Sequence, residues 1–236
     1  MSAEALFEQL KAKPRDLSLR AVYADALQQA GDPRGELLTL ETQLGALDPL
    51  GDAFWSLKPR RDVLRHDAAA DWLDAVLGLK QLRAEPIAWS GFPGTTRERW
   101  RWLRALLDQR FDVRTRDVGG DCERAKSVGR ALGASVREWI CLLDELIAQN
   151  AWERVFRDAL SLDLVEGQKA FSLMIQGEGD FHWAVPLAKL RAEDPPVVTF
   201  SLSERAKWVR STREGHYGPK PSVTEWARDF IRSYVE

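Results

Sequence analysis

From Met1 to Gly78, apolar side chains recur every three or four positions, which is the period of an α-helix with one buried face. The clearest repeat consists of Leu19, Val22, Tyr23, Ala26, Leu27 and Ala30. Gly31 follows it and can take the left-handed conformation that ends many helices, and Asp32-Pro33 prevents the helix from continuing. Another helix is expected directly afterwards, with Leu37, Leu40 and Leu44 on one face. The pattern predicts a small helical module.

A segment rich in glycine and proline, Ser90–Gly94, separates this module from the rest of the chain. Such residues favour connections, so we expect one domain in residues 1–90 and a second in residues 95–236. The second domain contains three pairs with the spacing of a helix-capping box, in which a Ser or Thr and a Glu bind each other's backbone N–H groups. The pairs are Thr95 with Glu98, Ser135 with Glu138, and Ser222 with Glu225.

Between the second and third of these predicted helices, the apolar pattern shortens to that of β-strands. Strands are expected at Ala170–Gln176, Phe181–Leu187 and Val197–Leu202, with a further one at Ala206–Arg210. The first two are joined by Gly177-Glu178-Gly179-Asp180, residue types that favour a tight turn. The succession predicts an antiparallel meander. The chain is therefore expected to have an α+β fold, in which a small helical N-terminal module precedes an antiparallel sheet flanked by helices.

The composition is that of an ordinary globular protein. Of 236 residues, 44% are hydrophobic, and a formal net charge of −2 gives no reason to expect a nucleic-acid or membrane partner. The N-terminal residues lack the features of a signal peptide. Two cysteines, Cys122 and Cys141, are too few for a disulfide framework, and Cys141 falls on the apolar side of a predicted helix. We expect a buried, inert thiol there and a cytoplasmic location.

Two carboxylates near the turn, Glu178 and Asp180, are the closest approach to a catalytic pair. Acid–base catalysis uses partly buried groups with shifted pKa values, whereas a tight turn between strands is normally hydrated. Turn chemistry is therefore the favoured interpretation, with contact to a partner protein as the alternative.

The three histidines, His66, His182 and His216, have no second His and no Cys at metal-ligand spacing. His182 precedes Trp183 on a predicted strand, so the two side chains point to opposite faces, and a structural role for the imidazole is favoured. The glycine patterns of nucleotide-binding loops and the motifs of serine and cysteine nucleophiles are absent from the sequence. We expect no cofactor, no metal and no enzymatic activity.

An arginine-rich segment, Arg97–Arg116, suggests a different function. It combines seven arginines and two tryptophans, a mixture that suits a nucleic-acid-binding surface. However, Trp100 belongs to the apolar stripe of the predicted helix, and Glu98 and Asp108 dilute the positive charge. A solvated helix face with intrahelical ion pairs is the favoured interpretation, and a nucleic-acid-binding module remains an alternative.

The segment Ala21–Leu44 resembles the bacterial repeat-companion domain. It contains the three hallmarks of that module: a Tyr-Ala-Asp helix at Tyr23–Asp25, a Gly-Asp-Pro-Arg-Gly-Glu turn at Gly31–Glu36, and a Leu-rich helix at Leu37–Leu44. The resemblance implies no specific function. From the residues themselves, we expect Arg34 to form an ion pair with Asp25 that locks the helical hairpin.

The C-terminal half resembles the SUKH superfamily, which includes a yeast cell-wall-synthesis regulator and many bacterial toxin-immunity proteins. Three segments carry the resemblance: Arg130–Trp139, Ala170–Phe200 and Ser222–Tyr234. It implies an immunity protein that binds a cognate toxin, or a regulatory or scaffold protein of the same fold. Partner-binding residues are expected at the hairpin and in the loop after the third strand, namely Gln176, Glu178, Asp180, His182, Trp208 and Tyr217.

Overall fold

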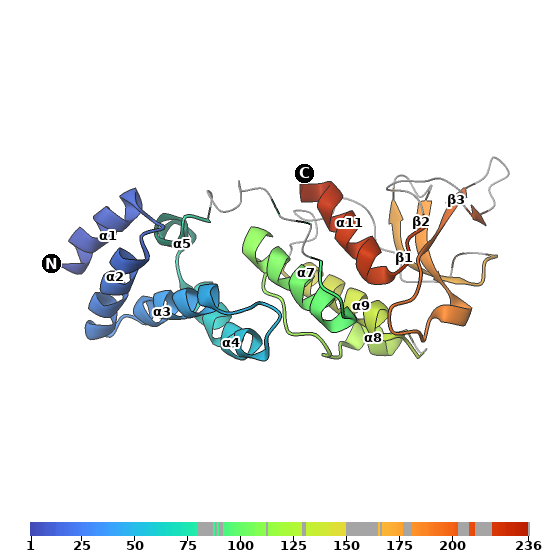
Figure 1. The fold of residues 1–236 in the computed structure, drawn as a ribbon, viewed down its shortest axis with the longest axis horizontal. Coiled ribbons are helices and arrows are strands. Elements are labelled where there is room, and N and C mark those ends of the chain that lie inside the picture. The colour runs from blue at the N-terminus through green and yellow to red at the C-terminus, as the bar shows by residue number, and fades with distance from the viewer. Residues whose placement is uncertain are drawn as a thin grey trace. The chain divides into compact units, whose positions relative to one another are not determined.

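The computed structural model describes residues 1–79, 87, 89, 92–111, 113–128, 131–149, 165, 167–176, 181–202, 208–210 and 219–235. The chain has an α+β fold and divides into two compact units, Met1–Gly91 and Phe92–Glu236 (Figure 1). The division falls inside Ser90–Gly94, the segment at which the sequence places a boundary.

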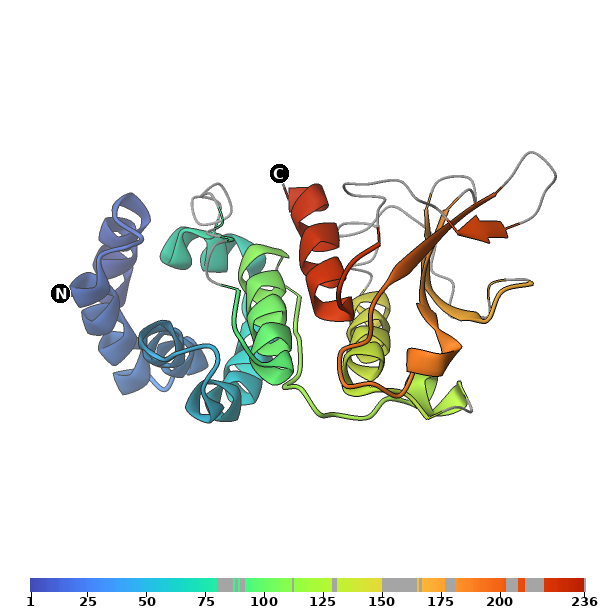
Figure 2. The same cartoon turned by 45° about the vertical axis from the view of Figure 1, so that its right-hand side comes forward.

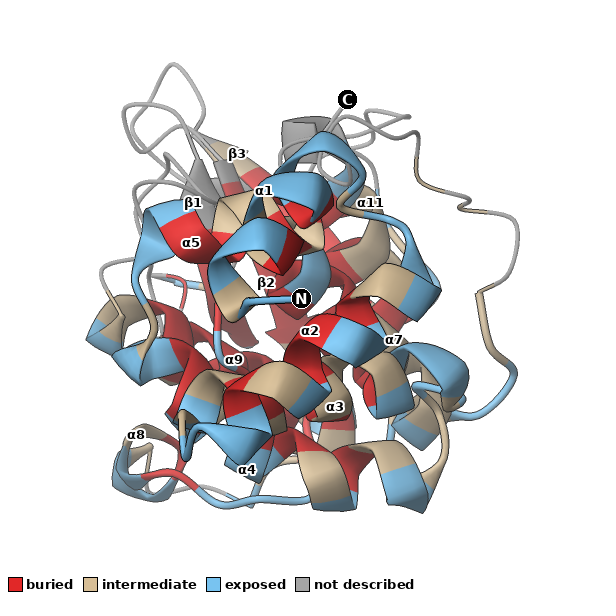
Figure 3. Ribbon diagram, turned by 90° about the vertical axis from the view of Figure 1, so that its left-hand side faces the viewer, coloured by how far each residue is buried: buried red, intermediate tan, exposed pale blue. Residues whose placement is uncertain are grey.

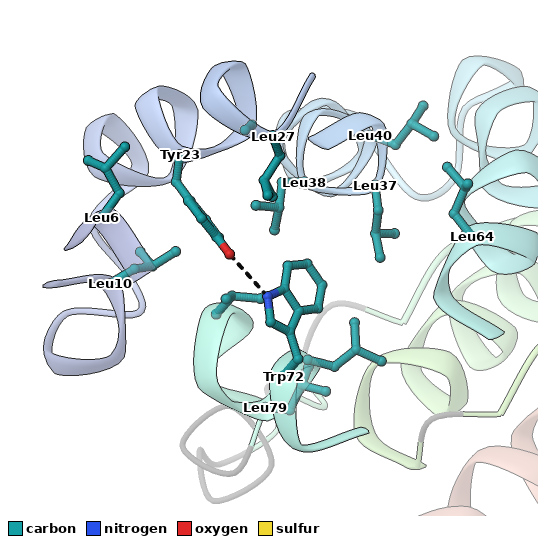
Figure 4. Packing of buried hydrophobic residues seen from close by; sticks show 13 residues of the cluster. Leu6, Leu10, Tyr23, Leu27, Leu37, Leu38, Leu40, Leu64, Trp72 and Leu79 are labelled. Carbon is teal, nitrogen blue, oxygen red and sulfur yellow. Dashed lines mark hydrogen bonds between the residues drawn. The ribbon is translucent and has the colours of Figure 1, made fainter. Parts of the chain in front are cut away.

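The first unit is helical. Its helices are α1 (Ala3–Ala12), α2 (Leu17–Gln29), α3 (Pro33–Ala46), α4 (Asp52–Asp67) and α5 (Ala70–Leu77). Each carries buried residues beside exposed ones, as Figure 3 shows for α1 to α5. The core gathers leucines from α1 to α4 around Tyr23 and Trp72, and Trp72 Nε1 donates a hydrogen bond of 3.3 Å to the Tyr23 hydroxyl (Figure 4).

The turn between α2 and α3 has the conformation that its residues favour. Gly31 has a φ of +71°, and Pro33 occupies the first turn of α3, where its missing N–H costs no hydrogen bond. Asp32 caps α3 by accepting the N–H of Arg34. The expected ion pair between Arg34 and Asp25 is wrong: Asp25 is exposed, and Arg34 binds the nearby Asp32 carboxylate and stacks on Trp72.

The second unit contains helices α7 (Thr96–Phe111), α8 (Glu123–Ser127), α9 (Ala134–Ala148) and α11 (Val223–Val235). Its strands are β1 (Ala170–Gln176), β2 (Phe181–Pro186), β3 (Val198–Leu202) and β4 (Trp208–Arg210), which pair in the order β1-β2-β3-β4. All three pairings are antiparallel, so the predicted meander is confirmed.

One face of the sheet packs against α9 and α11 (Figure 2). Large aromatic side chains make this contact. The ring centroid of Trp226 on α11 lies 4.7 Å from that of Trp139 on α9 and 6.2 Å from that of Trp183 on β2. Phe230 stacks on Trp226, and all four side chains are buried. Aromatic side chains of this size dominate the apolar area that a core removes from water, so this cluster holds the sheet rigidly to the two helices.

The helix starts follow the capping predictions in two of three cases. Thr95 and Glu98 form the reciprocal box at the start of α7, and Ser222 Oγ accepts the N–H of Glu225 at the start of α11. The predicted box at Ser135 and Glu138 is wrong. The residue that precedes α9 is Gly133, and Ser135 lies within the helix and accepts a hydrogen bond from Trp100 Nε1.

Candidate partner-binding site

The meander brings two strand connections to the same end of the sheet. Gln176, the last residue of β1, pairs with Phe181, the first of β2, and Phe181 in turn pairs with Ser201 of β3. Leu202, the last residue of β3, pairs with Trp208, the first of β4. Because neighbouring antiparallel strands reverse direction, these positions lie at one end of the sheet, which we call the hairpin end.

The opposite end of the sheet is attached to the helices. The segment that follows β2 contains Leu190 and Glu193, whose carbonyl oxygens accept the N–H groups of Gly133 and Ser135 at the start of α9, at 2.7 and 2.8 Å. Backbone carbonyls thus satisfy donors that a capping side chain would otherwise bind. We call this the anchored end.

Asp194 links the anchored end of the sheet to α11 by hydrogen bonds. Its carboxylate accepts the N–H of Thr224 at 3.0 Å and also the Thr224 hydroxyl. Arg99 of α7 lies 3.6 Å from the same carboxylate and 3.8 Å from that of Glu225. The helices α7, α9 and α11 therefore meet the sheet through polar contacts at this end.

The structure places two predicted site residues at the hairpin end. Gln176 ends β1 and Trp208 begins β4, and the backbone of each is described. Glu178, Asp180 and Tyr217 lie outside the described residues. The pairing register also places Phe181 and Ser201 at this end. Sequence reasoning did not select these two residues, although the expected strand ends at Phe181 and Leu202 were the signal that could have found them.

His182 is buried, so its selection as an exposed partner-binding residue is wrong. Its Nδ1 lies 2.8 Å from the hydroxyl oxygen of Ser172, which is also fully buried. Burial lowers the pKa of the His182 imidazole, because the charged form loses hydration. A serine hydroxyl beside an imidazole is an arrangement found in nucleophilic catalysis. Here it joins two neighbouring strands in the interior, which fits the structural role favoured from the sequence.

The arginines of α7 are held by acids from other elements. Arg101 pairs with Asp117, and its Nη2 lies 2.6 Å from the carboxylate, while Arg104 pairs with Glu138 and Glu145 of α9 at 3.1 and 2.7 Å. Both guanidinium groups are buried, with exposed fractions of 4% and 1%. The expected intrahelical pairs and solvated face are therefore wrong for these two residues, and their side chains are not available to contact phosphates.

The contact with Arg101 changes the pKa of the Asp117 carboxyl group. Burial alone would raise its pKa, but the hydrogen bonds from Arg101 and from the Val118 N–H outweigh that effect, so the pKa of Asp117 is lowered. Glu138 and Glu145 stand one heptad apart on an otherwise apolar helix face. Two acids on an apolar face were a sequence signal that a cation from another element packs against α9.

No cluster of His, Cys, Asp or Glu capable of holding a metal ion is found among the described residues. In the same part of the chain, none of the helices is both long and apolar enough to cross a membrane. Comparisons with protein-family models, with curated proteins and with solved structures find no match for this chain. The two family resemblances therefore stay predictions.

Proposed function

We propose that the chain is a non-catalytic, cytoplasmic protein-binding protein, most concretely an immunity protein that binds a cognate bacterial toxin through the hairpin end of its sheet. The partner class comes from the resemblance to the SUKH superfamily. The contrast between the two ends of the sheet supports the location: the segment after β2 is hydrogen-bonded to α9 and α11, whereas Gln176 and Trp208 stand at the other end.

The rigid core behind the sheet favours tight binding. Rigid surfaces lose little conformational entropy on association, and the packing of Trp139, Trp183 and Trp226 fixes the strands before any partner arrives. A tryptophan at the hairpin end, such as Trp208, is the residue type that most often dominates binding energy.

The test is protection against a toxin. The toxin domain of a large secreted protein encoded beside this chain is expressed with and without the full chain. We expect growth to be rescued by the chain, and a stoichiometric complex of the two purified proteins on a sizing column. Trp208→Ala, and the combined charge reversal Glu178→Lys with Asp180→Lys, should weaken the complex at least tenfold.

A matched control lies at the anchored end, where Lys189 and Arg191 are exposed. Lys189→Glu and Arg191→Ala should leave binding within about twofold of the unsubstituted chain, as is usual for residues outside an interface. Loss of binding in these controls, with full binding in the hairpin-end variants, would place the interface elsewhere. A complex without rescue of growth would favour a regulatory or scaffold role over immunity.

A further inference from the structure

The only two cysteines of the chain lie together in the folded second unit. Cys122 immediately precedes α8 and Cys141 lies in the middle of α9, and these two helices pack against each other. Both side chains are buried, with exposed fractions of 5% and 3%, and both are free thiols. Contact between the two thiol groups contributes to the raised pKa of Cys141. Residues far apart in sequence thus form a buried dithiol.

Among the described residues, helix α8 gives this dithiol little cover. Helix α8 has only five residues, and of these only Ala125 is buried, beside the preceding Cys122. An ion pair between Arg124 and Asp144 at 3.0 Å adds to that contact, and its side chains are 40% and 34% exposed. Short elements with few buried contacts open locally at low free-energy cost. Opening of α8 would therefore give a small oxidant access to both sulfurs.

We propose that Cys122 and Cys141 are a redox modification site, at which a peroxide converts the dithiol into an intramolecular disulfide that ties α8 to α9. This inference does not rest on the proposed toxin-binding function, because it concerns residues at α8 and α9 rather than at the hairpin end.

The order of attack follows from the surroundings of the two sulfurs. Burial, and contact with Cys122, raise the pKa of the Cys141 thiol, so Cys141 keeps its proton and is the poorer first nucleophile. The Cys122 thiolate attacks one oxygen of hydrogen peroxide, the O–O bond breaks, and a sulfenic acid and hydroxide form. The Cys141 sulfur then attacks the sulfenic sulfur and loses its proton, and hydroxide leaves. Both protons end in water, so two thiols and one peroxide give one disulfide and two waters.

Peptide mapping of the intact, full-length chain tests the site. The reduced protein is treated with hydrogen peroxide, alkylated with iodoacetamide and digested with trypsin without reductant. We expect titratable thiols to fall from two to none per chain, and a linked pair of peptides, Asp117–Arg124 with Glu138–Arg154, that dithiothreitol separates. The chain should remain monomeric on a non-reducing gel at low protein concentration.

Two variants separate the roles of the sulfurs. In Cys141→Ser, Cys122 should stop at the sulfenic acid and react with dimedone, whereas Cys122→Ser should give no linked peptide and no dimedone adduct. The mapping of the unsubstituted chain remains decisive even if a variant folds poorly. Two alkylated cysteines after peroxide treatment, or a disulfide only between two chains, would overturn the proposal.

Discussion

Gly133 and Ala192 approach so closely that no side chain fits at position 133. A β-carbon on Gly133 would overlap the carbonyl oxygen of Ala192. The contact lies at the anchored end, where Gly133 also donates its N–H to the carbonyl oxygen of Leu190 at 2.7 Å. The N-terminus of α9 and the segment after β2 are thus held at a distance that only glycine allows.

Gly133→Ala is therefore expected to destabilise the second unit. Relieving the overlap requires a backbone shift that also lengthens the hydrogen bonds of Gly133 and Ser135, and overpacking of this kind costs about 1–3 kcal/mol. The free energy of unfolding, measured in urea by tryptophan fluorescence, should fall by that amount. Gly94→Ala is the control, because nothing lies within 4 Å of a β-carbon at that position. Equal stability of the two variants would contradict the close-contact argument.

Gly35 allows a comparable test of close helix packing in the first unit. A β-carbon on Gly35 would lie 2.7 Å from the backbone oxygen of Ala24 and from the backbone nitrogen of Gln28, so α3 crosses α2 at a distance set by this residue. Gly35→Ala should lower the free energy of unfolding by about 1–3 kcal/mol.

The matched control for that substitution is Gly45→Ala in the same helix. Gly45 has free space around it, and alanine in a helix is favoured over glycine by about 0.5–1 kcal/mol, so this variant should be slightly more stable than the unsubstituted chain. A denaturation series in which both alanines stabilise the unit would show that the two helices can separate without cost.

The features that the sequence predicted correctly depend on local chemistry. Helical period in α2 and α3, the positive φ of Gly31, the cap at Thr95 and the alternation of the strands each involve residues close in sequence. The α+β fold and the antiparallel meander follow from them, and so does the hairpin end, since consecutive antiparallel strands must bring alternate connections together.

The predictions that were wrong concern partners chosen by tertiary contact. Arg104 binds acids 34 and 41 residues away on α9, which no i to i+4 rule identifies. Ser135 has the spacing of a cap, but backbone carbonyls after β2 fix where α9 begins, and the hydroxyl binds Trp100 instead. His182 is buried, and its imidazole contacts Ser172 on the neighbouring strand. For the candidate site, sequence therefore located the end of the sheet better than it located individual side chains.

Arg104→Met should be among the most destabilising single changes in the second unit. It would leave Glu138 buried without its guanidinium and Glu145 with only the exposed Arg116, and removing one partner of a buried ionic group costs about 3–5 kcal/mol. Urea unfolding should show this loss. Arg97→Met on the same helix is the control: Arg97 is 61% exposed and lies 3.7 Å from Asp117, so its loss should cost no more than about 1 kcal/mol.

A partial recovery of stability in a second variant would identify why Arg104→Met is destabilising. Adding Glu138→Met and Glu145→Met to Arg104→Met removes the two carboxylates that Arg104 binds, and the triple variant should be more stable than the single one. If the triple variant is instead less stable than Arg104→Met, the ionic group stabilises the fold by net attraction. In that case the cost of Arg104→Met does not come from leaving the carboxylates buried without their partner.

His182 should make the second unit less stable as the pH falls from 7.5 to 5.5. Burial lowers the pKa of the folded imidazole, whereas the unfolded imidazole titrates at about 6.5. Above that pH both states are neutral, and His182 contributes no pH dependence. Below it the unfolded chain binds a proton that the folded chain resists, so the free energy of unfolding decreases toward acid pH.

His182→Gln should therefore flatten the stability profile between pH 7.5 and 5.5, as measured by urea unfolding at several pH values in this range. The lowered pKa of Asp117 affects stability only in more acidic solution, because carboxylates of unfolded chains titrate at about 4, so this window contains the titration of imidazoles and not that of carboxylates. His66→Gln is the control, since His66 is exposed on α4 in the other unit, and its profile should match that of the unsubstituted chain. An unchanged slope in His182→Gln would mean that the buried ring takes up its proton inside the folded protein as readily as in the unfolded chain.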